Sequence, residues 1–268
     1  MEGFWTRQLL RAWAALVIAF LFIPIVLIPL YALNSSKIES WPIAGLSLRW
    51  IQLTINDPEV LTAVELSVRV ALTTTAVALL LGSAAAFAIQ RSNFFGRDAI
   101  NFLFVLPLAL PGIITGLALH AFFNYAALQL SIWTIVIGHT TFCIVVVYNN
   151  VLARLRRMQG SLVEAALDLG ANGLQTFRDI TLPLISTAVV AGAMLAFALS
   201  FDEVIVTTFT AGAQNTLPIW IYGQLRSGQR LPEVNVVVSF VVLVTIVPVL
   251  IAARLTGGGG AARGAAQR

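Results

Sequence analysis

Two adjacent carboxylates, Asp202 and Glu203, are the residues best placed to do chemistry within this mostly apolar chain. A charge within an apolar span is costly and usually functional, and no Lys or Arg follows this pair until Arg226. Neighbouring helical residues point about 100° apart, so we expect one carboxylate, preferentially Asp202, to face a pathway. It would attract a protonated amine and accept its N–H groups as the amine loses water. The alternative is solvation at the helix end or bonding to a partner subunit.

Other polar and aromatic residues could serve either transport or structure. Trp220 and Tyr222 could contact an amine through cation–π interactions, although anchoring at the lipid headgroups explains them equally well. His120 and His139 fall within apolar stretches. We expect helix-to-helix hydrogen bonds from these two histidines rather than a proton relay.

No set of residues for catalysis or metal binding is visible in the sequence. Glu65 and Arg69 are four residues apart on a predicted helix and are expected to neutralise each other. A phosphate-cradling glycine loop, a cluster of metal ligands and a nucleophile beside a base are all missing. We therefore expect no enzyme activity, and neither a cofactor nor a metal in this chain.

The elements that must position these residues are membrane helices. Of the 268 residues, 59% are hydrophobic and 10% are charged, whereas soluble domains carry about 25% charged residues. Backbone groups in lipid must be bonded within their own segment, so apolar stretches of about 20 residues predict helices. The sequence thus predicts an all-α membrane protein with six transmembrane helices. They cover residues 12–33, 70–89, 99–123, 130–152, 184–201 and 234–253.

Proline and glycine mark special points within these spans. Pro107, Pro111 and Gly112 interrupt the third span, which predicts either a packing kink or a break that lines a cavity. Small residues let membrane helices approach closely. The predicted close-packing glycines are Gly116, Gly138 and Gly192.

Basic residues are unevenly distributed between the two sets of connections. Eleven lie at the termini and in the second-to-third and fourth-to-fifth connections, against four in the remaining connections. The eleven are Arg7, Arg11, Arg91, Arg97, Arg154, Arg156, Arg157, Arg178, Arg254, Arg263 and Arg268; the four are Lys37, Arg49, Arg226 and Arg230. Positive residues stay in the cytoplasm, so we expect both termini and the loop at 160–182 to be cytoplasmic. We expect one permease-sized domain at 1–255 and a flexible glycine-rich tail at 256–268.

That cytoplasmic loop is unusually polar and contains signals for a short helix. Ser161 and Glu164 form a predicted capping box for a helix over residues 162–169. Gly170 can adopt the left-handed conformation that ends a helix. The pattern predicts a helix followed by a tight glycine turn.

A second short helix is expected after the turn. Asn172 is a suitable N-cap, the helix runs through Ile180, and Thr181 then caps the fifth span, with Pro183 in its first turn. Each short helix has a narrow apolar stripe, which is typical of a helix that docks in a groove. The spacing also fits a DNA-binding helix-turn-helix, but the net negative charge argues against nucleic acid.

The stretch EAALDLGANGLQTFRDITLP resembles the cytoplasmic EAA loop of binding-protein-dependent ABC importer permeases. The positions of that pattern fall on Glu164, Ala165, Ala166, Gly170, Ile180, Leu182 and Pro183. The resemblance implies that the loop forms coupling helices, which sit in a cleft of an ATP-hydrolysing subunit.

The resemblance extends over nearly the whole chain. GLSLRWIQL, LPLALPGIITGLAL, IGHTTFCIVVV and residues 199–228 are similar to the spermidine/putrescine branch of these permeases. This implies a type I ABC importer permease in a bacterial plasma membrane. Its implied partners are a second related permease, giving a heterodimer, two subunits that bind ATP and Mg²⁺, and an extracytoplasmic substrate-binding protein.

Alternative functions remain open at this point. Related permeases for ferric iron, opines or aminophosphonates share much of the pattern. A self-sufficient secondary transporter or channel is an alternative of a different class, and it would predict inverted repeats and buried charges in one chain. A membrane-embedded enzyme would need a polar catalytic cluster, which is missing.

Overall fold

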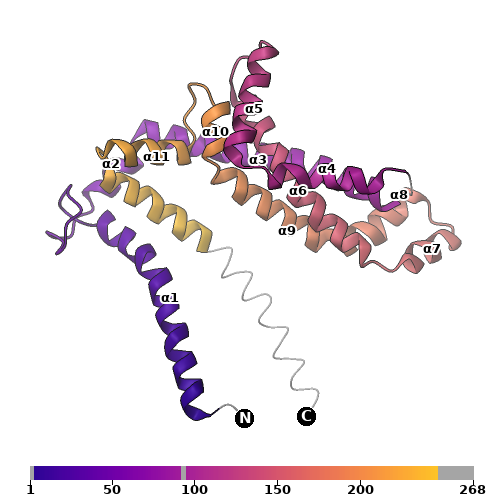
Figure 1. Cartoon of the computed structure of the whole chain (residues 1–268), viewed down its shortest axis with the longest axis horizontal. Coiled ribbons are helices and arrows are strands. Elements are labelled where there is room, and N and C mark those ends of the chain that lie inside the picture. The colour runs from indigo at the N-terminus through magenta and orange to yellow at the C-terminus, as the bar shows by residue number, and fades with distance from the viewer. Residues whose placement is uncertain (1–2, 92–94, 247–268) are drawn as a thin grey trace. The chain divides into compact units, whose positions relative to one another are not determined.

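The computed structural model describes residues 3–91 and 95–246, and this part of the chain is helical, with no β-strand. The end of the predicted sixth span and the predicted tail at 256–268 lie outside the described residues. The helices are α1 (Phe4–Ala32), α2 (Arg49–Ile55), α3 (Pro58–Arg91), α4 (Arg97–Ala109), α5 (Gly112–Tyr125), α6 (Ile132–Arg156), α7 (Gly160–Asp168), α8 (Gly173–Thr176), the π-helical turn η1 (Phe177–Thr181), α9 (Leu182–Phe201), α10 (Ile205–Thr210) and α11 (Leu217–Ser227), followed by an apolar helix at Leu231–Ile246 (Figure 1).

The predicted all-helical membrane fold is confirmed, whereas the count of six spans stays a prediction. Within the described ranges, four helices are long and apolar enough to cross a bilayer: Phe4–Ala32, Pro58–Arg91, Ile132–Arg156 and Gly173–Phe201. A fifth crossing is possible if α4 and α5 are counted together. The helix at Leu231–Ile246 is shorter.

The third apolar stretch is two helices rather than one straight span. The axes of α4 and α5 differ by 102° across the break between them. Leu110 at this break is extended, with ψ 138°, because a residue that precedes a proline is pushed out of the helical region. The predicted interruption by Pro111 is thus confirmed, and it is a full change of direction.

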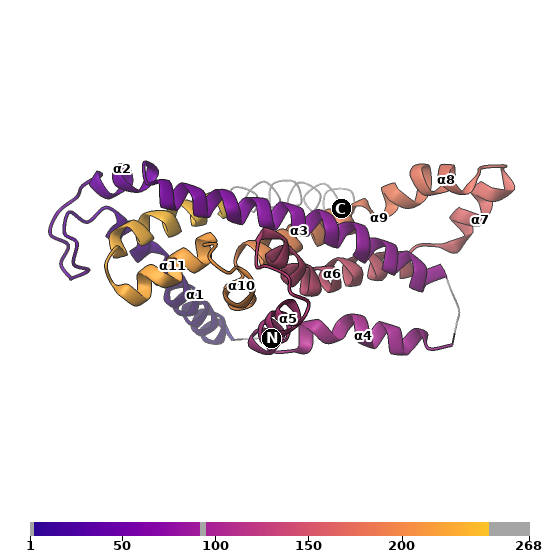
Figure 2. The ribbon, with the colours of Figure 1, turned by 90° about the horizontal axis from the view of Figure 1, so that it is seen from above.

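The chain divides into two compact units, one formed by Met1–Leu61 with Gly223–Arg268 and the other by Thr62–Tyr222. In the larger unit, α3, α4 and α9 pack against α6 (Figure 2). Its fully buried core joins small and branched residues of α3, α6 and α9. They are Ala78, Ala86, Ile89, Cys143, Val147, Tyr148, Val151, Leu152, Leu155, Ile185 and Ala196.

Gly82 allows α3 to lie close against α6. A Cβ at this position would lie 2.9 Å from the Ile144 carbonyl oxygen and 3.1 Å from the Tyr148 backbone nitrogen. Both atoms belong to the backbone of α6, so neither can rotate away. Of the predicted close-packing glycines, Gly116 is confirmed most strongly, because its Cβ would lie 2.6 Å from the Phe209 ring.

We expect Gly82→Ala to destabilise the larger unit by about 1–3 kcal/mol, the usual cost of an overpacked helix contact. The thermal unfolding midpoint of the detergent-purified protein should fall measurably. Gly223→Ala is the matched control, because its added methyl group meets no atom within 4 Å. Equal midpoints for Gly82→Ala and the wild type would contradict this account of the α3–α6 contact.

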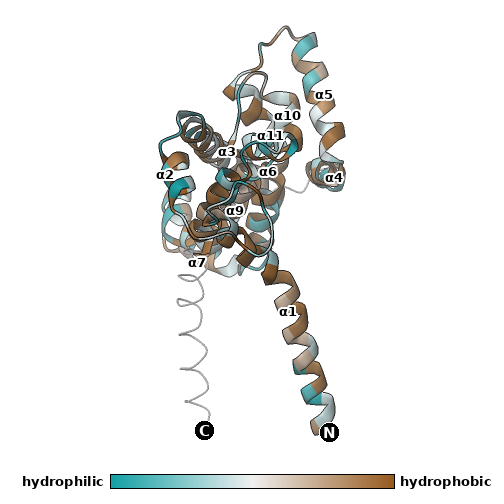
Figure 3. Ribbon diagram, turned by 90° about the vertical axis from the view of Figure 1, so that its left-hand side faces the viewer, coloured by the Kyte–Doolittle hydropathy of each residue, from teal (hydrophilic) through white to brown (hydrophobic). Residues whose placement is uncertain are grey.

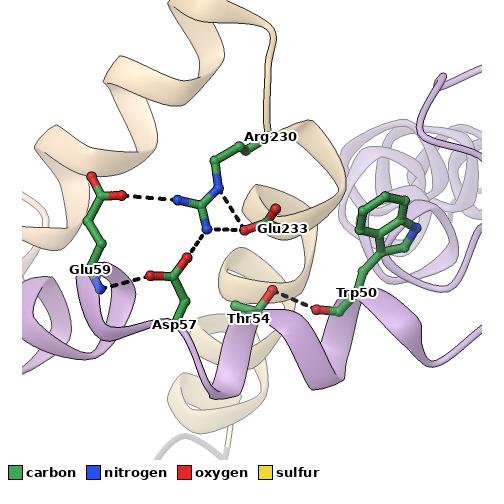
Figure 4. Close-up of polar contacts among 6 residues, drawn as sticks. All are labelled: Trp50, Thr54, Asp57, Glu59, Arg230 and Glu233. Atoms are coloured by element: carbon green, nitrogen blue, oxygen red, sulfur yellow. Dashed lines mark hydrogen bonds and ion pairs between the residues drawn. The ribbon is translucent and has the colours of Figure 1, made fainter.

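The smaller unit contains α1, which is apolar along most of its length (Figure 3), and a network of charges around Arg230. The Arg230 guanidinium donates to the carboxylates of Asp57, Glu59 (3.0 Å) and Glu233 (Figure 4). Burial alone would raise the pKa of Asp57, but the hydrogen bond and positive charge of Arg230 outweigh it and hold that pKa below its usual value. Hydrogen bonds to Glu233 and Asp57 raise the pKa of Arg230. This network ties the start of α3 to the residues before Leu231–Ile246.

Candidate functional site

The loop at 160–182 forms a helix–turn–helix projection at one end of the larger unit (Figure 2). Gly170 has φ +86°, which confirms its predicted left-handed conformation. Its N–H donates to the Leu167 carbonyl at 2.9 Å, and the Ala171 N–H donates to the Ala166 carbonyl at 3.0 Å. These two bonds together make a Schellman turn, so the direction of the chain after α7 depends on this glycine.

The predicted capping box at Ser161 and Glu164 is wrong. Helix α7 begins at Gly160, with Gln159 as its N-cap, and the Leu162 N–H donates to the Gln159 carbonyl at 3.2 Å. Ser161 is therefore already inside the helix, where its hydroxyl cannot cap. Glu164 is exposed and has no bonding partner in the part of the chain that the structure describes.

The second cap is confirmed, but the separate second helix is not. The Asn172 side chain accepts from the Gln175 N–H at 2.9 Å, and the Gln175 side chain accepts from the Asn172 N–H at 2.8 Å. After α8 the chain continues through the π-helical turn η1 directly into α9. Thr181 is helical and does not cap α9 with its side chain. The extra residue of the π turn keeps the backbone bonded throughout.

The projection exposes apolar side chains to its surroundings. Leu169 is 89% exposed and Leu174 is 75% exposed, and both lie next to the turn at Gly170. The other predicted loop residues are divided between surface and core: Glu164, Ala165, Gly170, Leu182 and Pro183 are exposed, Ile180 is half-buried and Ala166 is buried. The projection therefore carries large apolar side chains on its surface beside the turn.

The second part of the site is a break between α9 and α10, which contains the two predicted carboxylates. Asp202 is the C-cap of α9, is exposed, and has no side-chain partner among the described residues. The Glu203 carboxylate accepts from the Val206 N–H at 2.9 Å and so caps the start of α10. The structure therefore gives the two neighbours different environments, as the 100° rotation predicts.

The electrostatics of the break also separate the two carboxylates. The N-terminus of a helix is partially positive and its C-terminus partially negative. Glu203 offsets the positive start of α10, whereas the Asp202 charge adds to the negative end of the 20-residue helix α9. The field at Asp202 therefore favours a cation.

The break in the third apolar stretch lies beside this one. A Cβ on Gly112, the first residue of α5, would lie 3.7 Å from the Ile205 Cβ at the start of α10. His120 of α5 donates through Nδ1 to the Phe209 carbonyl of α10 at 2.8 Å. The two interrupted helices thus meet at their interruptions, an arrangement that membrane transporters use for binding sites.

The remaining predicted residues lie on other elements. Trp220 on α11 is 3% exposed and Tyr222 is 51% exposed, so Trp220 belongs to the core and Tyr222 lies partly at the surface. The predicted Glu65–Arg69 ion pair is present at 2.5 Å. The described residues contain no group of three or more His, Cys, Asp or Glu that could hold a metal ion.

Sequence reasoning missed two hydroxyl residues at the break, Ser200 and Thr207. Both are buried and both contact the His139 ring at 2.8 Å. The predicted helix-to-helix role of His139 is consistent with these bonds. A polar residue on either side of an Asp–Glu pair was the available signal, but hydroxyls within apolar helices commonly bond to their own backbone, so this signal was weak.

Residues 78–257 match the model of the family described as binding-protein-dependent transport system inner membrane component. The putrescine transport system permease protein PotI of Escherichia coli (strain K12) is 36% identical over 232 residues, which cover 83% of this chain and 81% of that protein. The spermidine/putrescine transport system permease protein PotC of the same strain is 32% identical over 246 residues, covering 91% and 92%.

A solved structure shares the fold. It is the crystal structure of a bacterial ABC transporter involved in the import of the acidic polysaccharide alginate. The matched chain gives a TM-score of 0.69 at 17% sequence identity and covers 96% of this chain and 98% of that chain. At this identity the likeness establishes the helical arrangement.

Proposed function

The chain belongs to the family of binding-protein-dependent transport system inner membrane components, and from this premise we propose that its cargo is a polyamine such as putrescine or spermidine. The family is one of transport permeases, and the chain is accordingly a permease subunit of an ABC importer. The names of two relatives that are more than 30% identical support the cargo.

The single feature of the chain that carries this proposal is the Asp202 carboxylate at the end of α9. Polyamines are cations, and an exposed carboxylate next to a helix C-terminus stabilises a cation. The adjoining break between α4 and α5 supplies backbone carbonyls that are not committed to a continuous helix. Asp202 therefore contacts the amine as it crosses, while Glu203 keeps α10 in place. Tyr222 and Trp220 are further candidates for the pathway.

The loop at 160–182 is the coupling element of the importer. Its matched residues are Glu164, Ala165, Ala166, Gly170, Ile180, Leu182 and Pro183, and the exposed leucines beside them fit the groove of an ATP-binding subunit. Two such subunits bind ATP and Mg²⁺, and closing them moves the projection. The movement passes into α9 without interruption, because η1 joins the loop to that helix.

The complete importer has further partners. A second related permease lines the other side of the pathway, and an extracytoplasmic binding protein delivers the cargo. Both termini and the loop at 160–182 lie in the cytoplasm of a bacterium, as the distribution of basic residues predicts.

Reconstitution of the whole importer in proteoliposomes tests the cargo. With its binding protein, ATP inside should drive uptake of labelled putrescine or spermidine, and unlabelled polyamine should compete. Ferric iron, an opine and an aminophosphonate are the matched alternatives. Uptake of one of these three in place of a polyamine would overturn the assigned cargo and leave the permease class intact.

A further inference from the structure

One buried histidine connects the two sides of the break at Asp202. His139 of α6 is 1% exposed. Its Nδ1 lies 2.8 Å from the Ser200 hydroxyl in the last turn of α9, and its Nε2 lies 2.8 Å from the Thr207 hydroxyl on α10. A single ring thus spans the interruption from the side of α6.

One tautomer of His139 satisfies every member of this network. The Thr207 hydroxyl donates to the Glu203 carbonyl at 2.7 Å, so it accepts from the ring when Nε2 carries the hydrogen. In that tautomer Nδ1 accepts from the Ser200 hydroxyl. The bonds run in one direction from Ser200 through His139 and Thr207 to Glu203.

The neighbouring residue on α6 allows this contact. Gly138 has no side chain, and a Cβ there would lie 3.1 Å from Val206 and 3.3 Å from Thr210. Helix α10 can therefore come close enough for both ring nitrogens of His139 to be bonded. His139, Ser200 and Thr207 are all buried, so each of these polar groups depends on its neighbours in the protein for a partner.

We propose that His139 is a positioning residue for Asp202, because it fixes the end of α9 against the start of α10 and so holds the break open with the Asp202 carboxylate presented. This inference rests on the proposed function, in which Asp202 meets the cationic cargo. His139 itself, buried among hydroxyls, does not touch the cargo.

The test changes one residue of the network at a time in the complete importer. His139→Leu is the direct variant, and Thr207→Val is a milder, nearly isosteric one that keeps the test interpretable should the first fail to fold. Thr207→Ser restores the hydroxyl. Thr208→Val is the matched control, since Thr208 is exposed on the same helix and donates only to the Val204 carbonyl.

The readout is the amount of spermidine imported per ATP hydrolysed. We expect Thr207→Val to lower it about tenfold, because it leaves the buried His139 ring without its hydroxyl partner on α10. Thr207→Ser and Thr208→Val should stay within about twofold of the wild type. In an Asp202→Asn background, Thr207→Val should add less than about twofold. A full tenfold effect of Thr207→Val in both the wild-type and the Asp202→Asn background would mean that Thr207 has only a structural role, and would overturn the inference. Normal import by Thr207→Val would also overturn it.

A second measurement needs no cargo and separates this inference from the proposed function. Cys143 is the single cysteine in the sequence, so Cys143→Ala with Asp202→Cys leaves one thiol, at the break. Its labelling rate by a charged thiol reagent should change about fivefold or more with Thr207→Val and return with Thr207→Ser. An unchanged labelling rate would refute the positioning role of His139, whatever the importer carries. If the labelling rates change as expected but the importer takes up no polyamine, only the proposed cargo is refuted.

Discussion

A valine in place of Gly170 is expected to lower coupled uptake about tenfold or more, because the turn after α7 requires a left-handed residue. The φ of +86° costs an ordinary L-residue about 1–2 kcal/mol, and a β-branched residue more. No atom lies within 4 Å of an added Cβ, so the effect comes from the backbone and not from a clash. The Schellman turn must open, which reorients α7.

Two matched variants isolate this cause. Gly170→Asn should keep most of the uptake, because asparagine tolerates the left-handed region. Gly160→Ala should be neutral, since that glycine is helical and also has open space around it. Uptake and ATP hydrolysis are measured on the same proteoliposomes. A normal amount of cargo transported per ATP in Gly170→Val would mean that the loop at 160–182 is not the coupling element.

The absence of a capping role makes Glu164 a cleaner probe of the same surface. Its carboxylate has no partner among residues 3–91 and 95–246, so its replacement removes no bond that holds α7 together. A Glu164→Ala effect on coupling would therefore report on a contact with another subunit. The double variant Glu164→Ala with Gly170→Val should abolish coupled uptake.

Features that depend on a few neighbouring residues were predictable from the sequence. The left-handed conformation of Gly170 and the reciprocal hydrogen bonds of Asn172 with Gln175 involve only residues that are close in the sequence. The residue types at these positions are therefore enough to predict them. The start of α7 was misplaced by the same kind of reasoning. Gly160 and Ser161 both accept helical angles, and the first turn forms on the Gln159 carbonyl rather than on Ser161, the better cap two residues later.

Features that depend on the approach of distant helices were not predictable. His139 bonds to residues 61 and 68 positions away, and Gly82 was overlooked because nothing near it in sequence indicates that α6 lies against it. The environment of Glu203 shows the intermediate case. Its adjacency to Asp202 predicted that the two side chains point in different directions. Its role as a cap, however, depends on a new helix that starts at Ile205, and the apolar sequence there does not indicate a helix start.

Asp202→Asn is expected to lower the cargo imported per ATP about tenfold or more. A carboxylate holds an ammonium group through charge-assisted hydrogen bonds, which are roughly twice as strong as neutral ones, and each 1.4 kcal/mol lost corresponds to about a tenfold change. Because the binding protein captures free polyamine, the loss should appear in the maximal rate and in the coupling ratio. The apparent affinity for external cargo should change little.

Glu203→Gln is the internal control, since the two variants remove the same charge one residue apart. The glutamine carbonyl can still accept from the Val206 N–H, so α10 keeps its cap and loses only the dipole interaction, about 0.3–1 kcal/mol. We expect import within about fivefold of the wild type from Glu203→Gln. Equal losses of import from Asp202→Asn and Glu203→Gln would show that import depends on the total negative charge at the break and not on Asp202 in particular. The opposite ranking would place the cargo against Glu203, and the helix-dipole argument for Asp202 would then be wrong.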